Sequence, residues 1–207
     1  MGEQDRQDRA GRRASIRLLG RPDRALDRLQ TASNEMDRQR VVLDWYWRLQ
    51  LESSLTEVWL AKADLGKARR QAARFLEAAH ATAERTWQAL AWETNARVAM
   101  AGADVARAQE CIGKAFSAIN EADLPLATWR VHATAAELFG RSGDSGSAEH
   151  HRELGRVAIL KLANSLPVDE PLRQTFLSAP AVTKVLGSRQ PTGLTAHRSK
   201  LATRIAA

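Results

Sequence analysis

Histidine and cysteine are the residues of this sequence best suited to metal binding or nucleophilic chemistry, and both are few. Cys111 is the only cysteine, which allows neither an internal disulfide nor a zinc site built on several cysteines. His150 and His151 are adjacent, so on a helix their side chains diverge by about 100° and lack the HExxH spacing of zinc hydrolases. We therefore expect no metal ligands, and we interpret His150 and His151 as surface residues, His132 as a packed or hydrogen-bonded histidine and Cys111 as an apolar filler.

The segment GDSGS, from Gly143 to Ser147, matches the motif around the nucleophilic serine of trypsin-like proteases. That chemistry needs a histidine base, an aspartate and oxyanion-hole amides held by a β-barrel. No stretch of this sequence alternates in the way that predicts strands, so we interpret GDSGS as a turn between helices. The phosphate-binding patterns GxxxxGK[ST] and GxGxxG are both absent. The sequence thus predicts a protein that is not an enzyme and holds no cofactor.

The aspartate of GDSGS belongs to a pattern that recurs along the chain. Asp64, Asp104 and Asp144 are spaced 40 residues apart. Other positions share this spacing: Ala68, Ala108 and Ala148; Val58, Val98 and Leu138; Ala79, Ile119 and Ile159; Trp47 and Trp87. Several columns with one period predict an internal repeat.

Each repeat is expected to form two helices joined by a tight turn, because apolar residues recur at helical spacing on both sides of the aspartate. The aspartate suits the N-cap of the second helix. Gly102 and Gly143 can end the first helix in the left-handed conformation. The alanine four residues after each aspartate lets the two helices approach closely. Pro125 and Pro167 follow the expected second helices and cannot continue them.

This unit resembles the tetratricopeptide repeat (TPR). The resemblance rests on the turn, on the small residue after it and on a tryptophan of the first helix: Gly143-Asp144 with Ala148, Asp104 with Ala108, and Trp92. It implies an all-α, right-handed solenoid of antiparallel helix pairs, with about three to four repeats and a C-terminal capping helix. The period of 40 exceeds the family's period of about 34 residues, and Glu52 and His132 stand where the tryptophan is expected.

These signals predict a helical repeat domain between two loose ends. We expect a disordered N-terminus at residues 1–14, the TPR-like domain at 15–186 and a flexible basic tail at 187–207. Inside the domain we expect a partial repeat, three repeats and a cap, at about 20–45, 46–82, 86–121, 126–165 and 168–186. In the cap, Asp169 or Glu170 is expected to precede a helix that has Pro171 in its first turn.

Positive charge is concentrated near the C-terminal end. No acidic residue follows Glu170, whereas six basic residues do: Arg173, Lys184, Arg189, Arg198, Lys200 and Arg204. Subtracting these six from the net charge of +7 leaves +1 for residues 1–170. The N-terminal residues contain no apolar signal segment, and no apolar run approaches the roughly 18 residues of a membrane span, so we expect a cytoplasmic protein.

The resemblance implies that the first helices line a concave groove that takes a protein or peptide segment. The groove residues would be Gln50, Ser53, Glu57, Glu93, Arg97, Arg130, Glu137 and Arg141. Arg97, Arg130 and Arg141 would meet acidic groups of the partner, because the guanidinium fork matches a carboxylate. A merely solvated helix face would present the same polar mixture. The six tryptophans all fall in first helices, where we expect most of them to be core residues.

The leading hypothesis is a non-enzymatic protein–protein interaction module. The repeats and the cap also resemble the C-terminal region of bacterial multidomain signalling proteins, in which a cyclase, kinase or NTPase precedes a TPR array, and this implies a regulatory or sensing role. The alternative is a nucleic-acid-associated or transcription-regulatory accessory protein that uses the basic tail. The sequence leaves open the partner, the oligomeric state and whether the chain is intact or part of a larger protein.

Overall fold

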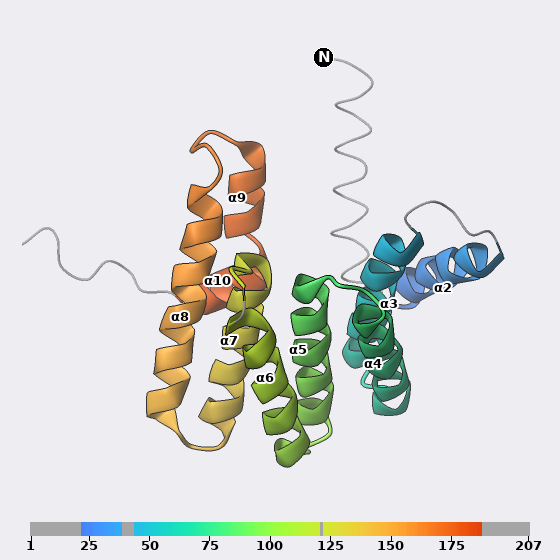
Figure 1. The fold of residues 1–207 in the computed structure, drawn as a ribbon, viewed down its shortest axis with the longest axis horizontal. Helices are drawn as coiled ribbons and strands as arrows, with labels where there is room; N and C mark the ends of the chain where they lie inside the picture. Colours follow the sequence, from blue (N-terminus) through green and yellow to red (C-terminus); the bar gives the residue numbers. More distant parts are fainter. Residues whose placement is uncertain (1–21, 39–43, 121, 188–207) are drawn as a thin grey trace, which may run out of the picture.

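The computed structural model describes residues 22–38, 44–120 and 122–187, and these fold into helices joined by short turns (Figure 1). The helices are α2 (Pro22–Arg38), α3 (Asp44–Ala61), α4 (Leu65–His80), α5 (Arg85–Ala101), α6 (Val105–Asn120), α7 (Pro125–Arg141), α8 (Ser145–Asn164), α9 (Pro171–Leu177) and α10 (Pro180–Leu186). No strand occurs in the described ranges, which confirms the all-helical prediction. The predicted N-terminal disorder at 1–14, and all of the predicted flexible tail except Gly187, lie outside the described residues.

The long helices from α3 onward follow one another as pairs. α3 packs on α4, α5 on α6 and α7 on α8, and each first helix also contacts the next, α3 with α5 and α5 with α7. The second helices α4 and α6 contact the first helix of the pair that follows. The pairs therefore form a row from α3 to α8, with α9 and α10 at the α8 end (Figure 1).

The turns inside the three pairs share one hydrogen-bond pattern. In each, the aspartate amide donates to a carbonyl five residues back, and the aspartate carboxylate accepts from the amide three residues on. The carboxylate contacts are Lys67 N to Asp64 Oδ1 at 3.0 Å, Arg107 N to Asp104 Oδ1 at 3.1 Å and Ser147 N to Asp144 Oδ1 at 2.9 Å. The predicted N-caps are confirmed, because all three carboxylates satisfy a free amide of the second helix.

The residue just before each aspartate has the left-handed backbone conformation. Its φ angle is 55° at Ala63, 58° at Ala103 and 84° at Gly143. The prediction is therefore right for Gly143 and wrong for Gly102, whose φ is −89°. The turn fixes its left-handed residue by distance from the capping aspartate, and in the middle turn that position holds Ala103 rather than the glycine before it.

The alanines four residues after the aspartates lie between the two helices of each pair. Ala68 and Ala108 are fully buried, and Ala148 is almost so. A Cβ atom placed on Gly140 of α7 would lie 3.9 Å from the Cβ of Ala148 of α8. Small side chains here permit the close approach that the sequence predicted.

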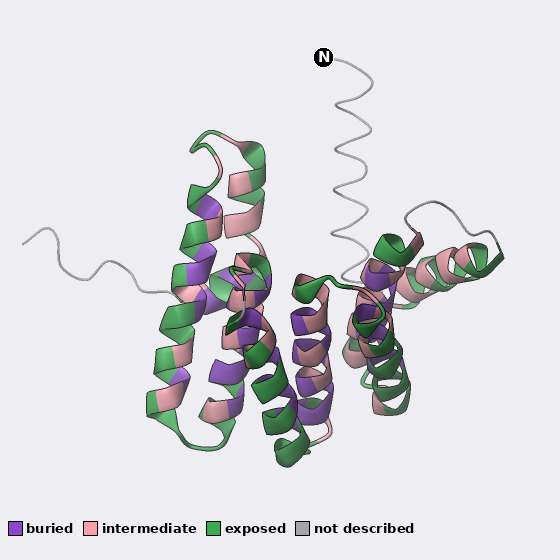
Figure 2. Cartoon of the chain, viewed as in Figure 1, coloured by how far each residue is buried: buried purple, intermediate pink, exposed green. Residues whose placement is uncertain are grey.

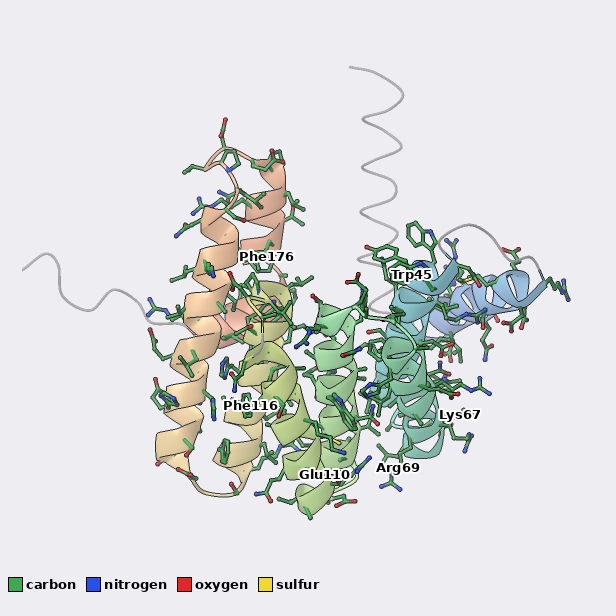
Figure 3. The ribbon with its side chains drawn as sticks, viewed as in Figure 1. Trp45, Lys67, Arg69, Glu110, Phe116 and Phe176 are labelled. Atoms are coloured by element: carbon green, nitrogen blue, oxygen red, sulfur yellow. The ribbon has the colours of Figure 1, made fainter. Side chains whose placement is uncertain are left out.

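The apolar core is divided among the junctions between helices rather than gathered in one centre. The last cluster joins α7 and α8 to the cap, through Trp129, Ile159, Val182 and Val185, with Phe176 of α9 packed against it (Figure 3). The cap helix α9 begins after Glu170, whose carboxylate accepts from the amide of Leu172 at 3.4 Å. Of the two predicted caps, Glu170 is the one that forms.

The tryptophans are less uniformly buried than predicted. Trp59 and Trp129 are buried, and Trp87 and Trp92 are half-buried. Trp45 and Trp47 are exposed in the first turn of α3, where the ribbon is coloured as exposed (Figure 2) and the side chain of Trp45 projects from the helix (Figure 3). Among the described residues, no helix combines the length and the apolar character that a membrane crossing requires.

Candidate functional site

A pocket of about 780 Å³ lies between α3, α5, α7 and the cap helix α10. We call it the α5–α7 pocket, because these two helices supply most of its wall. Apolar parts of the wall include Met100 and Trp129. Its charged residues are Glu57, Glu93, Arg97, Arg130, Glu137, Arg141, Arg152 and Lys184.

Six of the eight predicted groove residues line this pocket: Glu57, Glu93, Arg97, Arg130, Glu137 and Arg141. The other two, Gln50 and Ser53, lie on α3 about two turns and one turn before Glu57, respectively, and are half-buried outside the pocket wall. The row of first helices therefore brings most of the predicted set together, from α3, α5 and α7.

The 40-residue spacing places three charges of alternating sign side by side. Glu57, Arg97 and Glu137 occupy equivalent positions on α3, α5 and α7. Arg97 forms a bidentate ion pair with Glu57, in which Nη2 donates to Oε2 at 2.7 Å. Lys184 of α10 adds a fourth member, with its Nζ 3.3 Å from Oε2 of Glu137. We call these four residues the charge column.

The ionisation of the column is set by its own members together with neighbouring charged residues of the pocket. Burial alone would raise the pKa of Glu57, but the hydrogen bond from Arg97 and the charges of Arg97 and Arg130 lower it below its ordinary value. Burial likewise opposes the charge of Arg97, yet its bond to Glu57 and the charges of Glu93, Glu57 and Glu137 raise its pKa. For Glu137, Lys184 and Arg141 outweigh burial and lower the pKa. Glu57, Arg97 and Glu137 are therefore charged at neutral pH.

The three arginines expected to meet a partner differ in how many of their donors already bind groups of the chain itself. Arg97 is committed to Glu57, and Arg141 donates to Glu137 at 2.5 Å and to the carbonyl of Met100 at 3.2 Å. Arg130 approaches Glu57 only to 3.6 Å and donates no hydrogen bond to any other described residue. Arg130 is therefore the pocket arginine with the most capacity for an external acceptor.

The most buried acid of the pocket is Glu93, whose side chain is 2% exposed. Thr134 of α7 donates to Glu93 Oε1 at 2.6 Å, and Arg97 Nε lies 3.8 Å from the same oxygen. Glu93 thus ties α5 to α7 instead of facing a ligand. Thr134 was not among the predicted groove residues, although it follows Thr94 by the same 40 residues.

Two further pocket residues were missed as site residues, Trp129 and Lys184. Trp129 is buried, and its indole N–H has no acceptor among the described residues. Lys184 had been counted with the basic C-terminal end. It and Arg173, which donates to the carbonyl of Ala163 at 2.9 Å, bind the chain itself. The other four basic residues of that end lie outside the described residues.

A second polar contact joins α7 to α8. The Nδ1 atoms of His132 and His151 are 3.0 Å apart, and both rings pack against Phe116 of α6 (Figure 3). His132 is hydrogen-bonded as predicted, whereas the prediction of a surface position is wrong for His151, because α8 turns this side chain toward α7. Burial, with the charges of His151 and His150, lowers the pKa of His132 to about 4. Burial and His150 also lower the pKa of His151.

The GDSGS segment and Cys111, the other candidates for chemistry in the sequence, occupy structural positions. The GDSGS segment is the turn before α8, where Asp144 caps the helix that begins at Ser145. Cys111 is fully buried, and burial raises the pKa of its thiol. In the described part of the chain, no three histidine, cysteine or carboxylate residues come together as metal ligands.

Comparison with protein-family models and with curated proteins finds no match to this chain.

Proposed function

We propose that the chain is a non-enzymatic protein-interaction module that binds a segment of a partner protein in the α5–α7 pocket. In this proposal the helix pairs form a TPR-like, right-handed solenoid of three to four repeats, and the first helices present the binding face. A regulatory or sensing role in a bacterial signalling system, which the resemblance implies, is part of the same proposal.

The observation that carries the proposal is the coincidence of the repeat with the pocket wall. The spacing that places the capping aspartates also places Glu57, Arg97 and Glu137 along one pocket. Their ion pairs hold the wall in one geometry before any ligand arrives, which reduces the entropy cost of binding. A merely solvated helix face would not need charges that bind one another from helix to helix.

The charges of the wall favour an acidic partner segment. The pocket is lined by five basic residues and three acidic ones. Glu57, Glu93 and Glu137 are each engaged by basic or hydroxyl groups of the chain. Arg130 retains free donors beside the apolar surface of Trp129. A carboxylate of the partner would therefore meet Arg130, with neighbouring apolar side chains of the segment against Trp129 and Met100.

A peptide-display selection against the full chain tests the proposal. Peptides that bind should be enriched in acidic residues, and their affinity, measured by calorimetry, should fall about tenfold in the Arg130→Ala variant, since a charged hydrogen bond is worth roughly 1.5 kcal/mol or more. Arg107→Ala is the matched control, because Arg107 is an exposed arginine of α6 outside the pocket.

A blocking variant separates the pocket from the rest of the surface. Ala101 is exposed and lines the pocket, whereas Ala106 is exposed on α6 and does not line it. Ala101→Trp should abolish peptide binding and Ala106→Trp should leave it unchanged. Selected peptides that bind both tryptophan variants and Arg130→Ala with wild-type affinity would place the binding site elsewhere and refute the proposal.

A further inference from the structure

The outward face of α8 carries an apolar stripe. Leu154, Val157 and Leu160 are 36%, 55% and 37% exposed, and their spacing places them along one face of the helix. The opposite face, with Ala158 and Ile159, is buried against α7 and the cap. Helix α8 therefore has apolar side chains on both faces, although only one of them is covered by described residues (Figure 2).

The repeat supplies an internal control for this stripe. The equivalent positions 40 residues earlier in α6 are Lys114, Ser117 and Asn120, and 80 residues earlier in α4 they are Arg74, Glu77 and His80. All six are exposed. The same outward face is polar in α4 and α6 and apolar only in α8. These exposed positions therefore do not require apolar residues, and the leucines and valine of α8 need another explanation.

The stripe is complementary to itself. If a two-fold axis passes beside Val157, two copies of α8 lie antiparallel, and Val157 meets Val157 of the second copy. Residues at equal distances on either side of Val157 then face each other. Leu154 meets Leu160 of the second copy, and Leu160 meets Leu154 of the second copy. An isologous interface requires this property, because one surface must fit its own copy.

The flanking polar residues obey the same symmetry. Glu153 and Lys161 lie four residues before and after Val157, so the axis sets Glu153 opposite Lys161 of the second copy, twice per dimer. His150 and Asn164, seven residues to either side, also face each other. Glu153, Lys161, His150 and Asn164 are all exposed on the side of the stripe. An antiparallel pair is thus flanked by two ion pairs, whereas a parallel pair would oppose like charges.

We infer that the outward face of α8 is an interface for a second copy of this chain, which binds antiparallel about a two-fold axis at Val157. The contact extends over about three helical turns, roughly 16 Å. It therefore buries less than the roughly 1,600 Å² of a standard stable interface, and a dimer of micromolar or weaker affinity is expected.

Sedimentation velocity of the full chain between micromolar and millimolar concentration tests the inference. Wild type should shift from monomer toward dimer as its concentration rises. Val157→Lys should remain monomeric over the whole range. Ser117→Lys is the matched control, because it adds the same charge at the equivalent position of α6, and it should associate like wild type. A wild-type chain that stays monomeric up to millimolar concentration overturns the inference, as does a Val157→Lys variant that still dimerises.

Disulfide trapping tests the orientation. Val157→Cys should cross-link to itself under mild oxidation, because the two residues meet on the axis. Leu154→Cys and Leu160→Cys should cross-link when mixed, and neither should do so alone, because six residues of helix separate identical positions by about 9 Å, beyond disulfide reach. The native Cys111 is fully buried and does not interfere. Efficient self-cross-linking of Leu154→Cys and of Leu160→Cys would instead mean a parallel pair and would overturn the antiparallel arrangement.

Charge reversal provides an independent check. Glu153→Lys should weaken association severalfold, because it places two lysines opposite each other at both ends of the stripe. Combining it with Lys161→Glu should restore association to near the wild-type level. Circular dichroism confirms that each variant stays helical, since Glu153 and Lys161 also bind Arg156 and Asp123 within the chain. Equal association of the single and double variants would contradict the proposed pairing.

Discussion

The turns and the charge column follow the same 40-residue spacing but use it in opposite ways. In the turns the residue is aspartate each time, Asp64, Asp104 and Asp144. In the column the sign alternates, from Glu57 through Arg97 to Glu137. The difference lies in where each residue finds its partner.

Each capping aspartate binds an amide of its own turn, so every pair needs the same residue. In the column, Arg97 binds its equivalent Glu57 of the neighbouring pair, and two equivalents can attract only if their signs differ. Glu137 instead binds Arg141 of its own helix and Lys184 of the cap. The repeated aspartate therefore accompanies a contact inside each helix pair, and the change of sign from Glu57 to Arg97 accompanies a contact between two pairs.

Removal of Arg97 is expected to have the largest effect on stability. Arg97→Leu leaves Glu57 with Arg130 alone and deprives the buried Glu93 of its nearest cation. Breaking a fully buried ion pair costs about 3–5 kcal/mol, and because the Arg97 and Glu57 side chains are 31% and 36% exposed we expect a loss of about 2 kcal/mol. Urea unfolding followed by circular dichroism measures it.

The double variant Glu57→Leu/Arg97→Leu shows whether the column acts through contacts between pairs. Its loss in the free energy of unfolding should be smaller than the sum of the two single losses, because the second substitution removes a charge that is already unpaired. Strict additivity would mean that Glu57 and Arg97 act independently, like the aspartates of separate turns, and would contradict a stabilising contact between the pairs.

The contact between His132 and His151 supplies the second largest effect, and it depends on pH. The folded pKa of His132 is about 4, below its ordinary value of about 6.5. Between these two pH values the unfolded chain therefore binds a proton at His132 that the folded chain does not bind. The contribution of His132 to stability is therefore complete above a pH of about 6.5 and falls as the pH drops toward 4, by on the order of 2 kcal/mol once the shift is reduced for the screening of a half-buried ring by solvent. Urea midpoints measured across this range should decrease in wild type.

The His132→Phe variant is the control for this pH dependence. It keeps an aromatic ring against Phe116 and removes one titrating group, so its urea midpoint should change less between pH 6.5 and pH 4. An unchanged slope would assign the acid sensitivity to other groups. The contact joins the two helices of one pair through imidazole rings, whereas Arg97 and Glu57 of the charge column join neighbouring pairs through an ion pair.

Loss of a cap should have a smaller effect that is additive. Asp104→Ala is expected to cost about 1 kcal/mol, the usual value for an N-cap. Because Asp104 and Asp144 serve separate turns, the double variant Asp104→Ala/Asp144→Ala should lose the sum of the single losses in urea unfolding. A strong interaction between the two substitutions would show that the turns are not local units.

The smallest effect is expected at the left-handed residue of the turns. Ala103→Gly should stabilise the chain by about 0.5 kcal/mol, because relief of the left-handed strain exceeds the added freedom of glycine in the unfolded chain. Gly143→Ala makes the opposite change at the equivalent position and should lower the thermal midpoint. Destabilisation by Ala103→Gly would mean that the alanine side chain contributes more than its strain costs.

The sequence predicted features that repeat and missed features that depend on neighbours. The turn aspartates, the small alanines and the helical content follow from spacing and capping preferences, and all three agree with the structure. The left-handed residue was assigned to Gly102 instead of Ala103, because the choice rested on residue type rather than on distance from the cap. Trp47 is exposed, whereas Trp87, the equivalent residue 40 positions later, is half-buried, so the repeat does not determine burial at this position.

The sequence predicted most of the charged residues that line the candidate site, but not which of them bind one another. Its residues came from equivalent positions on first helices, and the structure places six of the eight in one pocket. The sequence does not show which arginine can bind an external acceptor, because this depends on distances between helices: Arg97 lies against Glu57 and Glu93, whereas Arg130 approaches only Glu57, to 3.6 Å. Lys184 joins the pocket through the packing of α10, which has no counterpart in the repeat.

The alternating charge column also restricts how this chain can change its length. Deleting the middle 40-residue unit would bring Glu57 beside Glu137 and set two carboxylates against each other. Loss of a terminal unit would leave the remaining charges in alternation. The column therefore restricts insertions and deletions inside the row of helix pairs, and leaves the ends of the row free to change in length.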